Sequence, residues 1–529
     1  MTPADELSAG AIRPLVRRLT GAGDPLALYE AVTAADRSDT FLLESGDRAT
    51  RTGALSLIGV RAAVRFRAGP DRIALTALSP NGEAALDWLA VLAPGGSRTG
   101  TEWTVPVPVG PAIEDERTRF RASSPLDLLR RLVFGPTLTA RPNPWCHLAA
   151  GTLGYDAIDW FERLPAGRPD PLDEPIIEVW IPDQLIVVDH VRASTTVVTT
   201  VWGGPGSSRR HHDANRALES LVAAVAADPR AERPPRPAPF EAGPAPDVDQ
   251  DDASYQATVT ALQERIRAGE VYQIVPSRTF RVPCGDSMAA YAALRRANPS
   301  PYLFYLASTD RIRFGASPET FLRIDGATRR ASLLPIAGTA PRGLGPDGTI
   351  DPDTDTRIEV TLRLDPKELA EHLMLVDLAR NDLARIGVPG TRVVSRLLEV
   401  ERFSRVMHLV SEVTATVAPG IDALEALATV MPIGTLVGAP KVRAAALLRE
   451  VEPSRRGGYG GAVGYLRSDG TLETAIVIRA AVVVDGQASV RAGAGVVLDS
   501  DPAREADETR RKAAAVLDAI RSAEVPAHV

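Results

Sequence analysis

A proline-rich stretch near the middle of the chain constrains its organisation more than any other feature. Residues 228–252 read DPRAERPPRPAPFEAGPAPDVDQDD. The stretch ends in acidic residues and has no periodic apolar pattern, which is typical of a linker. At 529 residues the chain is long enough for two or three domains. We therefore predict an N-terminal lobe over residues 1–230, a linker over 231–252 and a second domain over 253–525.

Helical and strand patterns alternate irregularly on both sides of this linker. Before it, β-branched runs predict a hairpin over residues 185–202, and apolar periodicity predicts helices over 125–133 and 214–226. After it, helices are predicted over 255–268 and 288–297. The strands predicted there are VYQIVPSRTFRV, PYLFYLA, GAVGYL, ETAIVIRAAVVV and ASVRAGAGVVL. Helices between strands exclude an all-β sandwich, and the lack of a regular βαβ rhythm argues against a doubly wound sheet, so the expected fold class is α+β.

Charge and cysteine content limit the partners of the chain. The formal net charge is -7 at pH 7, whereas proteins that bind nucleic-acid phosphates need a basic face, so no nucleic-acid partner is expected. Cys146 and Cys284 are the only cysteines and lie outside any CxxC motif, which argues against a disulfide framework and a zinc-thiolate site. No apolar run approaches the roughly 18 residues of a membrane span, and the N-terminus lacks the apolar segment of a secretory signal. We expect a soluble cytoplasmic protein with no membrane partner.

Two predicted helix starts carry pairs of carboxylates. At the first, Asp365 is the expected N-cap, Pro366 the first helical residue, and Glu368 completes a capping box. Glu371 follows Glu368 by three residues, so both carboxylates share one face of the helix. The same spacing recurs at the second start, with Asp501, Pro502, Glu505 and Glu508. The two pairs could converge on a divalent cation, for which an oxygen-only donor set favours magnesium over zinc. Acids in a first turn also stabilise the helix dipole while facing water, and spacing alone leaves both interpretations open.

Three further features are compatible with an anionic ligand. Arg479 lies inside the apolar run AIVIRAAVVV, where a buried guanidinium needs either a ligand carboxylate or an ion pair with one of the glutamates. The glycine-rich segments 457–461, which contain Tyr459, and 491–496 would let a ligand approach the backbone, or else serve turns and bulges. His408 lies in an apolar, strand-like run, where a lone histidine is either a packed core residue or a proton-transferring group.

A series of motifs fills the chain from about residue 255 to 523. They include GEVYQIVPSRTF, NPSPYLFYL, FGASPE, PIAGTAPRG, DPKELAEHLMLVDLARNDLARI, VMHLVSEV, GTLVGAPKVRA, RGGYGGAVGYL, IVIRAA and AGAGVVLDSDPAREADET. Together these strings resemble the chorismate-utilising enzymes, and among them the large subunit of anthranilate synthase of the enteric bacterial type. In the first lobe the resemblance rests on FLLES at residues 41–45 and on GTLGYDAIDWFERLP at 151–165. It implies the fold of that family, in which large antiparallel or mixed β-sheets pack together and are flanked by helices.

The resemblance also implies roles for individual residues. Glu371 and Glu508 would bind Mg²⁺, with Glu505 behind them reaching the ion through water. The residues expected to take part in catalysis are His408, Gln273, Thr435 and Glu368. The residues expected to hold chorismate are Gly338, Thr339, Tyr459, Arg479, Gly493, Ala494 and Gly495, with Arg479 and the backbone amides of the loop taking carboxylate oxygens.

The implied reaction adds ammonia at C2 of chorismate while the C4 hydroxyl leaves, and then eliminates pyruvate, with His408 accepting or relaying the C2 proton. Gln273 stands where water-using relatives carry a lysine, and Ala337 where many relatives that aminate C4 carry one. Both differences favour attack by ammonia at C2. Two alternatives stay open: a 2-amino-2-deoxyisochorismate synthase, which stops before pyruvate leaves, and a non-catalytic tryptophan-binding subunit.

The resemblance further implies a partner and an inhibitor. No Gly-Cys-Gly nucleophile motif occurs in the chain, so a separate glutamine amidotransferase subunit would supply the ammonia, in a heterotetramer that serves tryptophan biosynthesis. Tryptophan would inhibit the enzyme by feedback at a site that includes Ser45, Pro301, Tyr302 and Leu303. The alternative for FLLES is an ordinary strand end capped by a serine.

Overall fold

The computed structural model describes residues 6–46, 54–93, 95–108, 115–139, 143–227, 245–345, 349–402 and 406–524. Within the predicted linker, residues 231–244 lie outside the described part. Strands from both halves of the chain join in one sheet. The division of the chain into two lobes therefore stays a prediction.

Strands and helices are mixed in the first half of the chain. Its strands are β1 (Ala11–Thr20), β2 (Thr40–Glu44), β3 (Leu55–Ala68), β4 (Arg72–Ala77), β5 (Ser97–Thr99), β6 (Glu102–Pro106), β7 (Thr137–Leu138), β8 (Leu148–Leu153), β9 (Ile177–Asp189) and β10 (Ser194–Trp202). Its helices are α1 (Pro25–Val32), α2 (Pro80–Leu92), α3 (Glu116–Phe120), α4 (Leu126–Phe134), the 3-10 helix η2 (Tyr155–Trp160) and α5 (Ser207–Ala226).

The second half has the same mixed character. Its strands are β11 (Asp247–Val248), β12 (Gln273–Ile274), β13 (Ser277–Pro283), β14 (Tyr302–Ala307), β15 (Ile312–Ser317), β16 (Thr320–Ile324), β17 (Arg330–Leu333), β18 (Ile336–Pro341), β19 (Val393–Arg402), β20 (Val406–Thr416), β21 (Gly438–Ala439), β22 (Ala462–Arg467), β23 (Leu472–Ile476), β24 (Ala480–Val484) and β25 (Gln487–Gly493). Its helices are α6 (Asp252–Arg267), α7 (Ser287–Ala297), α8 (Pro352–Leu364), α9 (Pro366–Ile386), α10 (Ala423–Val430), α11 (Gly434–Val437), α12 (Lys441–Val451) and α13 (Pro502–Glu524).

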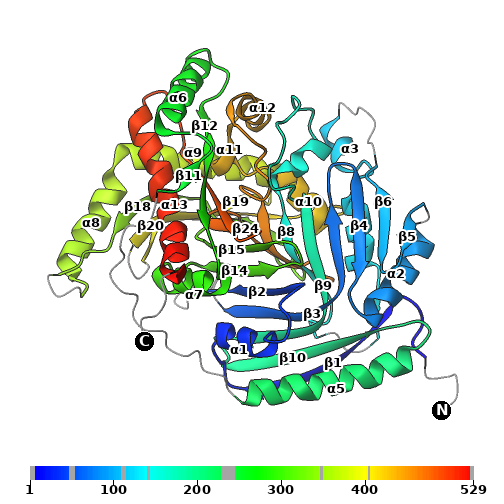
Figure 1. Cartoon of the computed structure of the whole chain (residues 1–529). Coiled ribbons are helices and arrows are strands. Elements are labelled where there is room, and N and C mark those ends of the chain that lie inside the picture. The colour runs from blue at the N-terminus through cyan, green and yellow to red at the C-terminus, as the bar shows by residue number, and fades with distance from the viewer. Residues whose placement is uncertain are drawn as a thin grey trace.

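Antiparallel strands from both halves form one extended hydrogen-bonded sheet, apart from a small sheet of β12 and β21. Two pairings join the halves: Leu303 of β14 faces Glu44 of β2, and Gly464 of β22 faces Gly151 of β8. Among the described strands only β1 and β7 pair in parallel. Helices flank the sheet, with α5 beneath β1 and β10 and with α7 and α13 packed together on another side (Figure 1). The predicted α+β class is confirmed.

Most predicted elements are present. The hairpin over residues 185–202 is formed by β9 and β10, and the predicted helices correspond to α4, α5, α6 and α7. The helix predicted to start at Asp365 is α9, which ends before Gly387. The helix predicted to start at Asp501 is α13.

Three predicted strands are wrong in length. VYQIVPSRTFRV is divided into β12 and β13 on either side of Pro276, which lacks the N–H that a strand ladder needs. ETAIVIRAAVVV is interrupted after Ile476 and resumes at Ala480, because Arg479 has φ of 52° and leaves the extended conformation. In ASVRAGAGVVL, strand β25 ends at Gly493.

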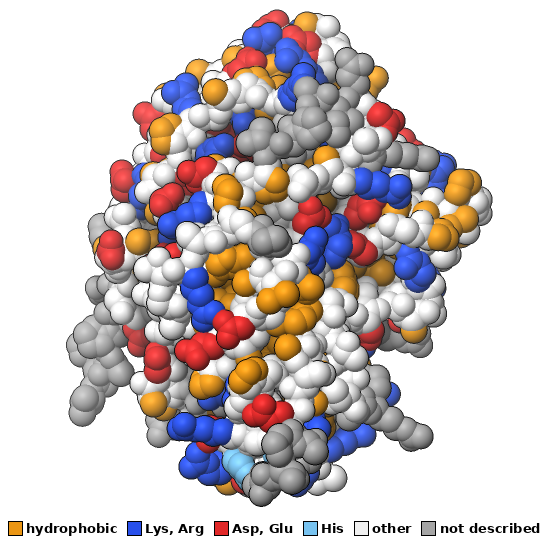
Figure 2. Space-filling view, turned by 90° about the vertical axis from the view of Figure 1, so that its right-hand side faces the viewer, with side chains coloured by type: hydrophobic (Ala, Val, Ile, Leu, Met, Phe, Trp, Pro, Cys, Tyr) orange, Lys and Arg blue, Asp and Glu red, His pale blue; other side chains and the backbone are white. Residues whose placement is uncertain are grey.

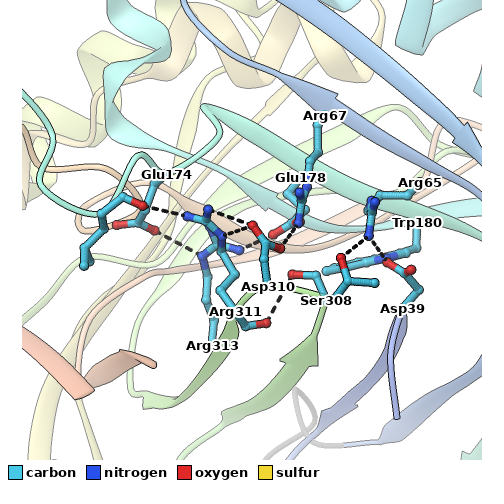
Figure 3. A network of polar contacts seen from close by, with 12 residues as sticks. Asp39, Arg65, Arg67, Glu174, Glu178, Trp180, Ser308, Asp310, Arg311 and Arg313 are labelled. Carbon is cyan, nitrogen blue, oxygen red and sulfur yellow. Dashed lines mark hydrogen bonds and ion pairs between the residues drawn. The ribbon is translucent and has the colours of Figure 1, made fainter. Parts of the chain in front are cut away.

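A buried network of charged groups connects the two halves (Figure 3). Arg313 of β15 donates from Nε to Glu174 Oε2 at 3.1 Å and from Nη1 to Glu178 of β9. Arg67 of β3 donates to the other oxygen of Glu178 at 2.6 Å. The Glu178 side chain is fully buried. Burial opposes its charge, but Arg313 and Arg67 outweigh this effect and hold the pKa of Glu178 below its ordinary value.

Apolar packing also crosses between the halves. One core cluster contains Phe41 and Trp180 from the first half together with Phe304, Val463 and Val477 from the second. Trp180 is fully buried, and its Nε1 donates to Asp39 Oδ1 at 2.9 Å. Shared core therefore adds to the backbone hydrogen bonds that join β2 to β14 and β8 to β22.

The surface of the protein carries charges of both signs. On the face in Figure 2, Lys and Arg side chains alternate with Asp and Glu, and apolar side chains gather near its middle. No helix in the described part of the chain combines the length and apolarity needed to cross a membrane.

Arg313→Met should destabilise the protein, since it leaves the fully buried Glu178 with Arg67 alone. Removing one partner of a buried ion pair costs about 3–5 kcal/mol. The measurement is the free energy of unfolding in urea. The control is Arg192→Met, which removes an ion pair with Asp189 in which the arginine is 74% exposed and whose loss costs about 0–1 kcal/mol. Equal losses in the two variants would contradict a stabilising role for the network.

Candidate active site

The two carboxylate-bearing helices begin as the sequence predicts. The Asp365 side chain accepts hydrogen bonds from the backbone N–H groups of Lys367 and Glu368 at the start of α9. The Asp501 side chain accepts from the N–H groups of Ala503 and Arg504 at the start of α13. These caps fix where the first turn of each helix lies, and therefore where its glutamates lie.

The glutamates of the two helices converge. Burial raises the pKa of Glu371, and the neighbouring charges of Glu368 and Glu508 raise it further. Burial likewise raises the pKa values of Glu368 and Glu505, and for each of them Glu508 adds to the effect. Because Glu508 belongs to α13 and Glu368 and Glu371 to α9, carboxylates from two helices face one another and their charges repel.

This carboxylate cluster fits a hard divalent cation. In the described part of the chain, no group of three or more His, Cys, Asp or Glu side chains is arranged to hold a metal ion by itself. Mg²⁺ commonly takes one or two protein carboxylates and completes its coordination with water and substrate oxygens. Glu371 and Glu508 supply such a pair from opposite helices, and a cation between them would relieve the repulsion that raises their neighbours' pKa values.

His408 is paired with a second predicted site residue. Its Nδ1 lies 2.8 Å from Thr339 Oγ1, and the two residues face each other across β18 and β20. Burial, with a contribution from the nearby charge of Arg479, lowers the pKa of His408 to about 4. The imidazole is therefore neutral at pH 7.

Arg479 lies beside His408 in an unusual backbone conformation. Its φ of 52° interrupts the run between β23 and β24, and its Nη1 donates to the backbone oxygen of Lys512 at 2.7 Å. The ion pair with a glutamate that the sequence left open is therefore absent from the described contacts of Arg479. Among the described residues the half-buried Arg479 guanidinium donates only to this carbonyl, so its charge is available to another anion.

The glycine-rich segments 457–461 and 491–496 lie around the same region as His408 and Arg479. A Cβ added to Gly493 would meet Tyr459 Oη at 3.0 Å, and one added to Gly495 would meet Gln273 Nε2 at 2.7 Å. Gln273 Oε1 is buried and has no hydrogen-bond partner among the described residues. The Ala494 N–H donates to the Pro276 oxygen at 3.3 Å, and its role in binding a carboxylate stays a prediction.

Gly338 and Glu368 lie on the side of this region formed by β18 and α9. Gly338 has φ of +82°, and a Cβ built on it would meet Glu368 Oε2 at 3.4 Å. Its positive φ and the bulge between Ala337 and Thr339 turn the Thr339 hydroxyl toward His408. The structure thus places the predicted site residues of β18, β20, α9 and α13 around one region.

Two further residues of this region, Lys512 and Glu319, were not predicted from the sequence. Lys512 donates from Nζ to Gly493 O at 3.1 Å and forms an ion pair with Glu508 at 2.5 Å, so it joins the carboxylate cluster to the glycine-rich loop. Burial raises the pKa of Glu319 to about 7, although the Thr435 hydroxyl and the Lys512 charge oppose the shift. Both residues had a signal in the sequence. Glu319 is the last residue of the FGASPE string, and Lys512 follows Glu508 by four residues and so lies on the same helix face.

The residues predicted to bind tryptophan line a separate cavity of about 160 Å³. Ser45 directly follows β2, and residues 301–303 span the start of β14, which pairs with β2. The cavity is closed on other sides by Arg323, Tyr465 and Glu473. The geometry brings the predicted residues together, and the ligand stays a proposal.

Comparison with known proteins identifies the family. The family model described as chorismate binding enzyme matches residues 109–518. The chain belongs to this chorismate-binding family. It is 44% identical over 512 residues to "Anthranilate synthase component 1" of Salmonella typhimurium, covering 94% of this chain and 95% of that protein. It is 43% identical over 490 residues to "Anthranilate synthase component 1, pyocyanine specific" of Pseudomonas aeruginosa, covering 92% and 91%.

Solved structures of chorismate-binding enzymes share the fold. Anthranilate synthase component I from Streptococcus pneumoniae superposes with a TM-score of 0.67 at 27% identity, over 88% of this chain and 93% of that one. The menaquinone-specific isochorismate synthase of Escherichia coli superposes with a TM-score of 0.65 at 18% identity, over 98% and 96%. At that identity the second likeness concerns the fold alone.

Proposed function

We propose that this chorismate-binding enzyme is the large subunit of an anthranilate synthase, which converts chorismate and ammonia to anthranilate and pyruvate. Relatives named anthranilate synthase component 1 match nearly the whole chain at 38–44% identity. The observation that carries the proposal is the neutral His408 paired with Thr339, beside Arg479 and the facing carboxylates of α9 and α13.

Substrate binding is assigned to groups that still have charge or hydrogen-bonding capacity. The Arg479 guanidinium and the amides around Gly493 and Gly495 would hold chorismate carboxylates, with the Tyr459 hydroxyl beside Gly493. Glu371 and Glu508 would hold Mg²⁺, with Glu505 behind them. When bound, this ion would offset the repulsion between the glutamates and the substrate carboxylates.

Proton transfer is assigned to two groups that burial keeps uncharged. Glu319 retains its proton up to about pH 7 and would donate it to the departing C4 hydroxyl as ammonia adds at C2. His408 would then accept the C2 proton as the ether bond between the ring and the enolpyruvyl group breaks, and this proton would pass to the methylene carbon of the released enolpyruvate to give pyruvate. Thr339 fixes the orientation of the His408 ring, Thr435 lies beside Glu319, and Glu368 lies beside Gly338.

The choice of ammonia over other nucleophiles is supported by two side chains. Gln273 lies against Gly495 and carries a neutral amide, which cannot activate water as a lysine would. Ala337 is buried in β18 and cannot attack the substrate. The presence of His408 as a candidate base favours the complete reaction over a 2-amino-2-deoxyisochorismate synthase, and the clustering of the predicted site residues favours an enzyme over a non-catalytic subunit.

Purified protein with chorismate, Mg²⁺ and an ammonium salt should form anthranilate, followed by its fluorescence, and an equal amount of pyruvate. Activity should need no glutamine, because ammonia reacts directly, and chelation with EDTA should abolish it. Product masses separate the alternatives. Accumulation of 2-amino-2-deoxyisochorismate without pyruvate would establish the halted reaction, and no turnover between pH 7 and 9 would exclude an enzyme.

His408→Gln tests the assignment of the second step in the same assay. The amide keeps a hydrogen bond to Thr339 but cannot accept the C2 proton at a useful rate, and a general base contributes about 10²–10⁴-fold. We expect pyruvate release to fall by this factor while aminated intermediate accumulates. An unchanged ratio of pyruvate to aminated product would remove His408 from the elimination.

The pH dependence tests Glu319. Its pKa of about 7 means that the donor is protonated below pH 7 and is lost as the pH rises, so kcat/KM for chorismate should fall about tenfold per pH unit above pH 7 at constant free ammonia. Glu319→Gln should have low activity and no such decline. Glu30→Gln is the control, because burial also raises the pKa of Glu30, which lies on α1. If the alkaline decline persists in Glu319→Gln, another group must be the acid.

A partner subunit and an inhibitor complete the proposal. The component 1 designation of the relatives supports the existence of a second component. We assign that role to a glutamine amidotransferase that releases ammonia from glutamine, in a heterotetramer. The cavity between β2 and β14 is assigned to tryptophan, which would make the enzyme sensitive to the end product of its pathway.

Millimolar tryptophan should raise the midpoint of thermal unfolding and inhibit anthranilate formation. Binding at 100 times the Kd stabilises a folded protein by about 2.7 kcal/mol. Ser45→Leu places a larger side chain in the cavity and should abolish both effects, whereas Ser38→Leu, at an exposed position of the same segment, should not. Tryptophan inhibition that survives Ser45→Leu would place the inhibitor elsewhere.

A further inference from the structure

A buried ion pair at the end of α12 lies between the active-site segments but has no role in the proposed chemistry. Glu452 caps α12, and Arg456 follows four residues later, just before the glycine-rich segment 457–461. Their exposed fractions are 5% and 4%. Arg456 donates from Nε to Glu452 Oε2 at 2.9 Å and from Nη2 to Oε1 at 2.6 Å, a two-point contact.

Arg456 also holds the backbone of two active-site segments. Its Nη1 donates to Leu436 O at 2.6 Å, next to Thr435 in α11. Its Nη2 donates to Val275 O at 2.6 Å, two residues after Gln273. The guanidinium further lies 5.7 Å from the ring centroid of Tyr459 and 4.8 Å from that of Tyr155, within the range of cation–π attraction.

Glu452 extends the same arrangement to the loop that carries Gly493. Its Oε1 accepts from the backbone N–H of Ser277 at 2.9 Å and from the Ser277 hydroxyl at 2.7 Å. Its Oε2 accepts from Arg491 Nη2 at 3.1 Å. Arg491 belongs to β25, two residues before Gly493. One ion pair thus contacts the segments of Gln273, Thr435, Tyr459 and Gly493.

Only a planar guanidinium can make these contacts together. Arginine presents five N–H donors in a fixed fork, which here reaches the carboxylate on one side and two carbonyls on the other. A lysine would keep the charge, but its single nitrogen cannot span acceptors on opposite edges of the site or stack on Tyr459 as a plane.

We propose that Arg456, held by Glu452, is a positioning residue that sets the spacing of the Gln273, Thr435 and Tyr459 segments around chorismate. The proposal rests on the proposed function for its substrate. Arg456 itself contacts no reacting atom, so its effect on turnover is exerted through the residues that it holds.

The test compares Arg456→Lys with Arg65→Lys. Arg65 forms a similar ion pair, 2.8 Å from Asp39, with side-chain exposures of 11% and 9%, but it lies on β3 in the first half. Both variants carry the same chemical change at a largely buried arginine. We expect kcat/KM for chorismate to fall about 10- to 100-fold in Arg456→Lys, with a higher KM and a lower kcat, and to stay within about threefold of wild type in Arg65→Lys.

Amide hydrogen exchange measures the positioning without turnover. Arg456→Lys should exchange faster at residues 273–277 and 434–438 while β1, β9 and β10 stay protected. If Arg456→Lys does not purify, Glu452→Leu combined with Arg456→Met replaces both charges by apolar side chains, a change that folded proteins often tolerate. That double variant should show the same loss and the same faster exchange.

The outcomes separate the two proposals. If wild-type protein is inactive, the proposed function fails, and the exchange comparison still tests Arg456. If wild type is active but Arg456→Lys matches Arg65→Lys in activity and its exchange is unchanged, the positioning role is wrong. A fall in activity with uniformly faster exchange over the whole chain would also overturn it, because the effect would then be a general loss of stability.

Discussion

Backbone pairing between β2 and β14 ties the two halves of the chain into one sheet, and both candidate binding regions depend on it. In this register Leu303 faces Glu44, which brings Ser45 beside residues 301–303. The neighbouring β15 pairs with β24, which follows Arg479 directly. The Arg479 oxygen also accepts from Ala316 of β15 at 3.0 Å. A shift of one residue would turn every side chain on these strands to the opposite face, so the cavity and the active site share one constraint.

Buried charge reinforces the joints of this sheet. Glu178 and Arg313 meet where β9 and β15 approach, and Glu174 lies against Gly457, where an added Cβ would come within 2.3 Å of its carboxylate. Such pairs add little net stability over well-packed apolar residues, but they are costly to separate. They therefore suit places where loops must keep one geometry. The glycine-rich segment 457–461 has few side chains of its own to hold it, and charged neighbours hold it instead.

The sequence predicted those parts of the molecule that depend on local chemistry. Asp365 and Asp501 cap their helices as expected, because capping involves residues within one turn. The interruption of the strand at Arg479 was not predicted, since a positive φ at arginine is set by its surroundings rather than by β-propensity. Glu319 was missed for the same reason: its raised pKa comes from burial among residues distant in sequence. The convergence of the two carboxylate helices was suggested by spacing, but only the fold brings Glu508 near Glu371.

Burial shifts the pKa values of Glu319 and His408 in opposite directions by one physical effect. Removing water disfavours the charged form of any group, which raises the pKa of a carboxyl and lowers that of an imidazole. Glu319 moves to about 7 and His408 to about 4, so near neutral pH a protonated carboxyl and a neutral imidazole coexist. The proposed donor and the proposed acceptor thus owe their shifted pKa values to the same burial. The same loss of water strengthens the repulsion within the carboxylate cluster, which supports the proposal of a cation bound there. Exclusion of water from this region therefore supports both the proposed acid and base roles and the proposed magnesium site.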